Sequence, residues 1–299
     1  MNKNISIKEI LEYLNCKNEN YKFEGKRDIY INGFSSYANY KVGGITWIKS
    51  RKTMEQCSSV QNVTLAVVQD GVEAPIAESR IIVEESKRVF FDLLDHFFST
   101  EKKQEPIGHN TYLSPEVKLG KNVVIGHNCT LDGDISIGDG TRIYNNVSII
   151  NCVKIGKNCE IQSGVKIGHD GFAFTEDQQF RKSMIKHYGG VTIEDNVFIG
   201  GNCHIARGTI DHTVIGEGSK IDASCSIAHN CRIGKNVAMI MGSRIYGSVD
   251  VGDNAYIATA TIRNQIAIGI NAVIGMGSVV TKDVEDNAVV IGVPAEIIR

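Results

Sequence analysis

A histidine in the second half of the chain has neighbours that could support acyl transfer. His229 stands two residues after an aliphatic residue, in the segment Ile227-Ala-His-Asn. Gly247 follows it by eighteen positions, Asp211 precedes it by eighteen, and Asp222 is nearby. An imidazole can take the proton of an attacking amine, a glycine N–H can stabilise an oxyanion, and a carboxylate can fix the imidazole tautomer. The set predicts attack on a carbonyl, although a polar surface residue is the simpler interpretation of any single histidine.

A six-residue repeat predicts the framework that would hold these groups. Every sixth residue from Ile107 to Ile167 is Ile or Leu, and glycine often follows. This period is typical of a parallel β-helix with three faces per coil, in which the aliphatic residue points inward and residues eighteen apart stack. The expected fold class is therefore mainly β. The period returns at Ile193, passes through Ile210 by two five-residue steps and continues to Val280.

The stretch that breaks the repeat, residues 169–190, carries aromatic and imidazole side chains. The aromatic and imidazole side chains belong to His169, Phe172, Phe174, His187 and Tyr188, and Asp170 adds a carboxylate. We expect either a surface loop or a flap over a bound ligand, with His169, Phe172 and Phe174 in contact with substrate. No metal site is expected, because no pair of side chains here has the spacing typical of zinc ligands.

The first 103 residues lack the repeat and predict a small α/β domain. Ser6 and Glu9 form a capping-box pattern that opens a helix, and Ser86 is expected to be the N-cap of a second helix. Strands are expected over residues 29–34, 44–49, 64–68 and 80–83. The only tryptophan, Trp47, lies close to Lys49. It is either a core residue or a platform on which a nucleotide base stacks, with Lys49 near the phosphates.

Composition narrows the functional class. The 299 residues include 32 Lys and Arg against 34 Asp and Glu, without blocks of like charge, so nucleic-acid binding is not expected. No apolar run approaches the ~20 residues of a membrane-spanning helix, and the polar N-terminus lacks the apolar core of a signal peptide. We expect a cytoplasmic protein without membrane insertion, whose eight scattered cysteines are free thiols.

Several segments resemble one enzyme family, the UDP-3-O-acylglucosamine N-acyltransferases of lipid A synthesis. The likeness extends from residue 5 to about residue 280 and is carried by Ile167-Gly-His-Asp-Gly-Phe-Ala-Phe174, Ile210-Asp211, Val214-Ile-Gly216, Lys220-Ile-Asp222 and Ile227-Ala-His-Asn230. It implies a homotrimer with active sites between subunits, in which a uridine-binding domain (residues 1–103) precedes a left-handed β-helix (residues 104–299). It also implies His229 as general base, Gly247 as oxyanion-hole residue, Asp222 beside the base, and Trp47 as the aromatic residue that stacks on uracil.

The chain departs from this family where the nucleotide and the donor are concerned. Ser50 and Thr53 stand where the family has Asn and Tyr, so either UDP or dTDP is expected. The segment Ile262-Arg-Asn-Gln-Ile266 replaces the family's second histidine. The closing cap, residues 279–299, resembles the ending of coenzyme A-dependent hexapeptide acetyltransferases instead of the family's helical tail. Acyl-CoA is therefore the favoured donor, with Arg263 and Lys282 as candidates to bind its phosphates.

These observations predict an enzyme that moves an acyl group from a thioester to the amino group of a nucleotide-linked amino sugar. In a milder mechanism the leaving thiolate takes the proton and His229 only positions the amine. The chief alternative is the UDP-3-O-(3-hydroxyacyl)glucosamine N-acyltransferase itself, with an acyl carrier protein as donor. A β-helix that binds without turnover is a further alternative, and serine O-acetylation would leave the Trp47 domain unexplained. Met239, Met241 and Met276 are candidates for an acyl channel or plain filler.

Overall fold

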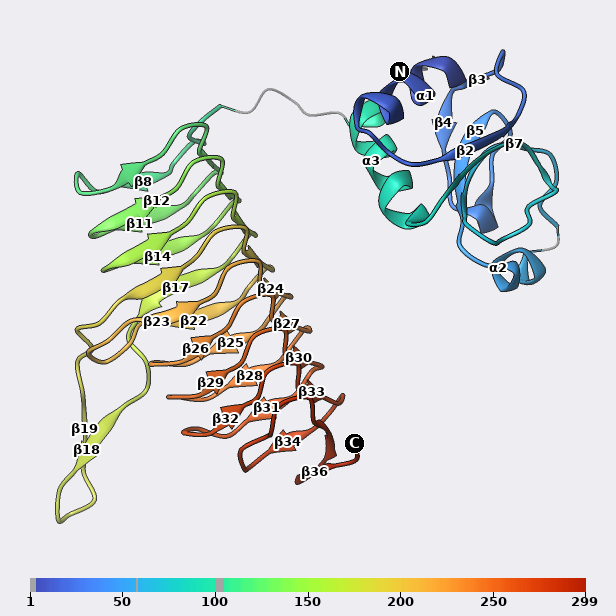
Figure 1. Cartoon of the computed structure of the whole chain (residues 1–299). Coiled ribbons are helices and arrows are strands. Elements are labelled where there is room, and N and C mark those ends of the chain that lie inside the picture. The colour runs from blue at the N-terminus through green and yellow to red at the C-terminus, as the bar shows by residue number, and fades with distance from the viewer. Residues whose placement is uncertain (1–3, 58, 100–104) are drawn as a thin grey trace. The chain divides into compact units, whose positions relative to one another are not determined.

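Two compact units make up the chain, Met1–Lys102 and Lys103–Arg299 (Figure 1). The computed structural model describes residues 4–57, 59–99 and 105–299. Within these ranges, no helix is both long enough and apolar enough to cross a membrane.

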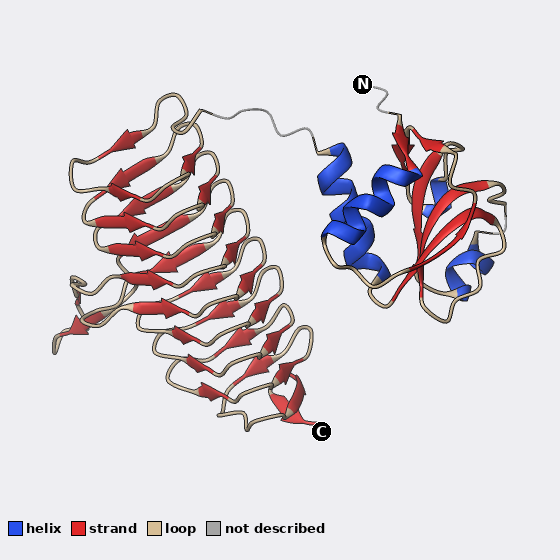
Figure 2. Ribbon diagram, turned by 45° about the horizontal axis from the view of Figure 1, so that its top comes forward, coloured by secondary structure: helices blue, strands red, loops and turns tan. Residues whose placement is uncertain are grey.

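A five-stranded sheet with order β2-β7-β6-β5-β4 forms the centre of the first unit. β2 is antiparallel to β7, and the other neighbours are parallel. Apolar side chains of α1 and α3 cover one face of the sheet, and α2 and η1 pack on the other (Figure 2). The elements are α1 (Ile7–Cys16), α2 (Arg51–Gln56), α3 (Ser86–Phe98), the 3-10 helix η1 (Tyr37–Asn39), and strands β1 (Ile5–Ser6), β2 (Lys22–Gly25), β3 (Tyr30–Ile31), β4 (Gly33–Phe34), β5 (Gly44–Ile48), β6 (Val63–Gln69) and β7 (Ala77–Val83).

The two predicted helix starts have different outcomes. The Ser6 hydroxyl accepts a hydrogen bond from the Glu9 N–H at 3.2 Å, and the Glu9 carboxylate accepts one from the Ser6 N–H at 2.8 Å, so the capping box is confirmed. Ser86 is not an N-cap, because it is the first residue of α3 and Glu85 precedes the helix. Its hydroxyl instead accepts a hydrogen bond from the Trp47 indole. A local sequence pattern cannot reveal that long-range partner.

Three parallel sheets form the faces of the β-helix in the second unit. The chain visits the first, second and third face in turn, and each corner is named here after the face that precedes it. The first face holds β8 (Tyr112–Leu113), β11 (Thr130–Asp132), β14 (Ser148–Ile150), β17 (Lys166–His169), β22 (His204–Ala206), β25 (Ser226–Ile227), β28 (Arg244–Ile245), β31 (Thr261–Ile262) and β34 (Val279–Val280).

The other two faces are built in the same way. The second face holds β9 (Lys118–Leu119), β12 (Ile135–Ile137), β15 (Val153–Ile155), β20 (Val191–Ile193), β23 (Thr213–Ile215), β26 (Arg232–Ile233), β29 (Asp250–Val251) and β32 (Ala267–Ile268). The third face holds β10 (Val124–Ile125), β13 (Arg142–Ile143), β16 (Glu160–Ile161), β21 (Phe198–Ile199), β24 (Lys220–Ile221), β27 (Ala238–Met239), β30 (Tyr256–Ile257), β33 (Val273–Ile274), β35 (Val289–Gly292) and β36 (Ala295–Ile297). The last strand turns back antiparallel to β35.

A continuous aliphatic column fills the coils. Ile227, for example, pairs with Ile205 on the coil before it and with Ile245 on the coil after it. Burying such a side chain contributes roughly 1.5–3 kcal/mol, so the column is the main source of stability. The predicted register is wrong at Ile210, which is 81% exposed. The chain leaves the coil after β22 and returns only at Thr213, which pairs with β20.

The predicted break in the repeat is a hairpin that projects from the coils (Figure 1). It leaves after β17 and returns before β20, and its arms are β18 (Phe174–Glu176) and β19 (Lys182–Met184), which pair antiparallel. Because β15 pairs directly with β20, the stack continues beneath the hairpin without a gap.

Candidate active site

The first corner carries a cavity of about 370 Å³ around His229. The strands β25, β28 and β31 are neighbours on the first face, so the residues that follow each of them come together at this corner. The cavity is lined by Phe172, Ala228, His229, Tyr246, Gly247, Ser248, Asn264 and Gln265. The sequence prediction that Gly247 lies one coil beyond His229 at the same corner is consistent with this arrangement.

Two glycines hold the His229 ring between them. A Cβ at Gly247 would lie 2.7 Å from Cε1 of His229, and a Cβ at Gly171 would lie 2.7 Å from Cδ2. Such distances exclude any side chain at either position unless the ring moves. The Gly247 carbonyl accepts a hydrogen bond from the Gln265 N–H at 3.0 Å, whereas the Gly247 N–H has no partner in the described part of the chain. That N–H is available to an oxyanion.

Asn230 fixes the protonation pattern of the resting His229 ring. The Asn230 side-chain oxygen accepts hydrogen bonds from the Thr209 N–H at 2.7 Å and from its hydroxyl at 3.1 Å. The amide nitrogen must then face Nδ1 of His229, at 3.2 Å. An amide nitrogen can only donate, so Nδ1 accepts and the neutral ring carries its proton on Nε2.

The surroundings of His229 favour the uncharged ring. Burial lowers the pKa of the His229 imidazole, and the neighbouring His187 lowers it further, whereas a hydrogen bond to the Phe172 backbone raises it. Charged imidazolium is disfavoured in a partly apolar site because it loses hydration. At neutral pH the ring is therefore uncharged.

Two residues that the sequence did not identify as site residues anchor the insertion beside His229. Arg207 is 8% exposed, its guanidinium donates to the His187 carbonyl, and its Nε lies 3.7 Å from the Asp170 carboxylate. Asp170 in turn accepts a hydrogen bond from the His187 N–H at 3.4 Å. These contacts tie both ends of the insertion to the coil, so Gly171 and His187 are held against the His229 ring. A buried arginine in an irregular stretch gives no sequence signal.

The insertion residues that are predicted to contact substrate differ in whether they line the cavity. Phe172 lines it and is 76% exposed, and its ring packs edge-on against Phe174 at 5.6 Å. His169 faces the coil instead, with Nε2 3.2 Å from the Ser148 hydroxyl. Burial is the main reason that the pKa of His169 is lowered.

The two predicted aspartates do not hydrogen-bond to the His229 ring within this chain. Asp222 follows β24 and therefore belongs to the third corner, where its carboxylate accepts hydrogen bonds from the N–H groups of Ala223 and Met241 at 2.7 and 3.2 Å. Asp211 lies exposed in the loop between β22 and β23. The partner of Nδ1 is the Asn230 amide instead, and the roles of both aspartates remain predictions.

The two candidate donor-binding cations lie further along the first corner. Arg263 follows β31 and Lys282 follows β34, and both side chains are exposed. The Arg263 guanidinium donates to the Thr281 carbonyl at 3.4 Å. Both cations thus lie on the coils beyond His229, on the same edge of the stack.

In the first unit, Trp47 and Lys49 share the wall of a cavity of about 560 Å³. The Trp47 indole donates to the Ser86 hydroxyl at 2.8 Å and packs against the rings of Phe90 and Phe91. The ring is therefore partly a core residue, as the simpler interpretation expected, while it still borders a cavity. Ser50 and Thr53 are engaged with each other, because Ser50 caps α2 through the Thr53 N–H.

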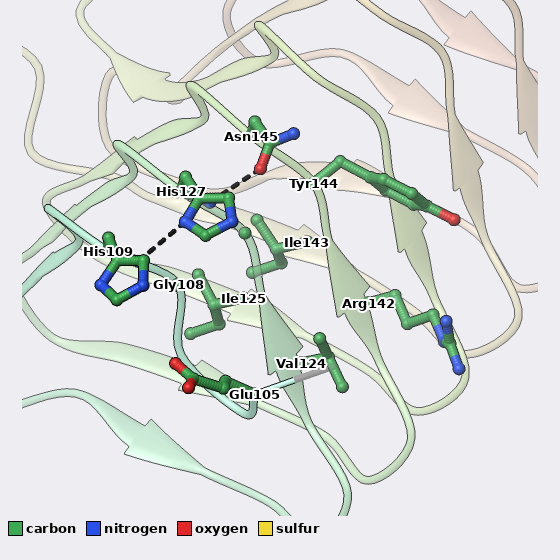
Figure 3. A pocket seen from close by; sticks show the side chains of 11 residues that line it. Glu105, Gly108, His109, Val124, Ile125, His127, Arg142, Ile143, Tyr144 and Asn145 are labelled. Atoms are coloured by element: carbon green, nitrogen blue, oxygen red, sulfur yellow. Dashed lines mark hydrogen bonds between the residues drawn. The ribbon is translucent and has the colours of Figure 1, made fainter. Parts of the chain in front are cut away.

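A smaller cavity of about 170 Å³ lies at the first coils (Figure 3). Nδ1 of His127 accepts a hydrogen bond from the His109 N–H at 2.8 Å, and Asn145 accepts one from the His127 N–H at 2.7 Å. The two imidazoles stack in parallel at 5.5 Å. These side chains form hydrogen bonds and a ring stack between neighbouring coils, so we assign this cavity a structural role. Nowhere in the described ranges do three His, Cys, Asp or Glu side chains gather as a metal site requires.

Comparison with known proteins places the chain among hexapeptide-repeat transferases. The profile of the family described as bacterial transferase hexapeptide (six repeats) matches residues 134–169 and 212–239. The profile of the hexapeptide repeat of succinyl-transferase matches residues 116–151 and 258–282. Among solved structures, the UDP-N-acetylglucosamine acyltransferase of Francisella novicida is 25% identical, with a TM-score of 0.58 over 64% of this chain and 69% of its own. The O-acyltransferase of Moraxella catarrhalis is 22% identical, with a TM-score of 0.60 over 64% and 74%. The predicted left-handed β-helix is thereby confirmed.

Curated relatives define the family more closely. The UDP-3-O-acylglucosamine N-acyltransferase of Bordetella parapertussis is 35% identical over 126 residues, which are 41% of this chain and 35% of that protein. The chain thus matches about a third of that relative's length. The enzyme of the same name from Campylobacter lari is 38% identical over 279 residues, which are 89% of this chain and 88% of its own. The predicted resemblance is confirmed, and the chain belongs to the UDP-3-O-acylglucosamine N-acyltransferase family.

Proposed function

We propose that this protein transfers an acyl group from a thioester to the amino group of a UDP-linked 3-O-acylglucosamine. The observation that carries the proposal is the His229 ring, held between Gly247 and Gly171 at the edge of an open cavity. The near full-length likeness to the Campylobacter lari enzyme supports this acceptor over a dTDP-linked sugar.

The arrangement supports a two-stage transfer. His229 takes a proton from the sugar amine while the nitrogen attacks the thioester carbonyl carbon, and the Gly247 N–H stabilises the negative charge on the carbonyl oxygen. The carbon–sulfur bond then breaks, and the thiolate leaves with the proton that the imidazolium returns. The products are an amide on the sugar and a free thiol.

One contact favours a second mechanism at the same site. Because Asn230 donates to Nδ1, the resting ring has its proton on Nε2, and Nε2 can act as a base only after the ring changes tautomer. In the alternative mechanism, His229 positions the amine and the leaving thiolate receives the proton. The size of the rate loss on removal of the imidazole distinguishes the two mechanisms.

For the donor, we propose a thioester on acyl carrier protein ahead of acyl-CoA, which reverses the preference drawn from the closing residues. The supporting observation is the likeness to the Campylobacter lari enzyme, which covers 89% of this chain and is not confined to its closing residues. Arg263 and Lys282 suit either donor, because both donors carry a phosphopantetheine phosphate that exposed cations can bind.

For the acceptor, we propose that the cavity beside Trp47 receives the nucleotide base and that Lys49 pairs with a phosphate. The indole borders that cavity although its N–H is already bonded to Ser86. Stacking uses the face of a ring and leaves its N–H free for such a bond. The resemblance implies a homotrimer, and we propose that state for this chain as well.

The test combines one substitution with two donors. We expect His229→Ala to lower kcat about 100-fold or more if the imidazole is the base, and less than about tenfold if it only positions the amine. Gel filtration and melting temperature serve as the folding controls. His127→Ala is the matched control, because that imidazole lies in the cavity of the first coils and should leave kcat unchanged.

Side-by-side assays of 3-hydroxyacyl carrier protein and 3-hydroxyacyl-CoA, each with UDP-3-O-acylglucosamine, settle the donor. We expect thiol release from the carrier-protein thioester to exceed that from the CoA thioester at least tenfold in kcat/KM. Faster release from CoA would overturn the donor assignment. Consumption of neither thioester would overturn the proposed function.

A further inference from the structure

A second imidazole packs against the proposed reactive one. The His187 ring is fully buried (0% exposed), and its centroid lies 5.4 Å from that of His229 with the planes at 80°. Gly171 touches both rings, since a Cβ there would lie 2.9 Å from Cβ of His229 and 3.0 Å from Nε2 of His187. Only the missing side chain of Gly171 leaves room for this approach.

The hydrogen bonds of His187 leave one nitrogen without a partner. Nδ1 lies 3.0 Å from the Ile185 carbonyl, which can only accept, so Nδ1 carries a proton. Nε2 of the neutral ring then holds a lone pair, and this buried atom has no hydrogen-bond partner among residues 4–57, 59–99 and 105–299. Leaving a buried polar atom unpaired destabilises a fold by about 1–3 kcal/mol, so its place beside His229 indicates a functional reason.

Two contacts to the His187 backbone hold this imidazole in place. The Arg207 guanidinium holds the His187 carbonyl, and Asp170 holds the His187 N–H. Among the described residues, Asp170 and Arg207 are charged groups that contact His187 itself. Asp211 and His212 pack against Gly189 and Gly190, which follow it, and Tyr246 is a further titratable group in the wall of the His229 cavity. The Asp170 carboxylate is engaged by Arg207 and by the His187 backbone.

The geometry points to His187 as a positioning residue for His229: the insertion presents a fixed second imidazole that orients the reactive ring and keeps that ring uncharged. The inference rests on the proposed role of His229 and adds a source for its charge state. The buried His187 ring excludes water from this side of His229, and an imidazolium there would lose hydration, so the uncharged form of His229 is favoured. The lowered pKa of His229, to which both burial and His187 contribute, agrees with this assignment.

The test follows the His229 ring itself, by NMR titration of the full-length protein labelled with ¹³C at histidine Cε1. His229→Gln identifies the resonance. We expect His229 to titrate at a higher pH in His187→Gln and His187→Asn than in the unsubstituted protein. The Asn variant retains a donor for the Ile185 carbonyl, and the Gln variant retains a polar atom near the position of Nε2. In the acyl transfer assay, both should lose about twofold or more of kcat/KM at pH 6 relative to pH 8.

His127→Gln is the matched control, because that imidazole also stacks on another histidine but does so in the first coils. It should change neither the His229 titration nor the pH profile. If both His187 variants leave the His229 titration unchanged, the inference is overturned and His187 is a packing residue, even where activity or melting temperature falls. If no thioester is consumed by any form, the proposed function fails while the titration still decides the relation between the two rings.

Discussion

At the scale of single residues, Asn230 and His187 act on the two sides of one imidazole. Asn230 donates to Nδ1, and His187 places a buried ring against the carbon edge. Both contacts favour the neutral ring over imidazolium, because a donor at Nδ1 repels a proton there and a second imidazole disfavours positive charge. Neighbours that take no part in the chemistry itself therefore control the charge state of the side chain that we propose for catalysis.

The pH dependence follows from these neighbours. The pKa of His229 is lowered from 6.5, principally by burial, so the reactive neutral ring persists below that pH. Asn230→Asp would place a carboxylate beside Nδ1 and raise the pKa of His229, because an anion stabilises imidazolium. We therefore expect the acidic limb of kcat/KM to move to higher pH in this variant, measured as a full pH–rate profile.

The matched control for this substitution is Asn254→Asp. Asn254 occupies another corner with the same left-handed backbone, φ +60° for both residues, and its amide donates to Asn271. Its pH profile should match that of the unsubstituted enzyme. An Asn230→Asp profile that also stays in place would show that the ring titrating in kcat/KM is not His229.

At the scale of elements, the coil beneath the site makes a quantitative prediction. The Ile227 side chain is fully buried in the aliphatic column, two residues before His229. Ile227→Ala should lower the free energy of unfolding by about 2–5 kcal/mol, because it removes three buried carbon atoms and leaves a cavity. The urea midpoint measures this loss. Ile210→Ala is the matched control: that side chain is 81% exposed and should shift the midpoint very little. Equal shifts for the two variants would contradict the loop assigned to Ile210.

The same two isoleucines show how far the sequence predicts these elements. Ile227 fits a strict period of six, and the period alone specifies that it points inward on a flat coil. Ile210 can be fitted only by two five-residue steps, and it lies in a loop. A local helix-start pattern predicts Ser86 as an N-cap, although its hydroxyl accepts a hydrogen bond from Trp47 on strand β5. A regular period of buried residues can be recognised in the sequence, whereas hydrogen-bond partners that are distant along the chain cannot.

The candidate site shows the same limit to what the sequence predicts. His229 and Gly247 could be aligned in advance because eighteen residues make one coil. The insertion has no period, so nothing in the sequence indicated that His187 would return to His229 or that Arg207 would be buried to hold it. The separation of Asp222 from His229 within one chain follows from the same count, because the two residues follow strands of consecutive faces, the third and the first.

At the scale of the whole molecule, the candidate acyl-channel residues lie at a different corner from His229. Met239 is fully buried inside the coil, which agrees with its interpretation as filler of the core and not as a channel residue. Met241 and Met276 are exposed at the third corner, after β27 and β33. His229 stands at the first corner, so an acyl chain that contacts both these methionines and the imidazole requires a second copy of the chain.

The proposed homotrimer satisfies that requirement, with the first corner of one subunit facing the third corner of the next. Light scattering should then give about 98 kDa, three times the 32.7 kDa of one chain. We expect homotrimers of His229→Ala and of Met241→Asp each to be nearly inactive. Random mixing of the two variants should restore about a quarter of the activity, because one interface in four joins an intact His229 to an intact Met241. Absence of recovery after verified subunit exchange would show that each site is complete within one chain.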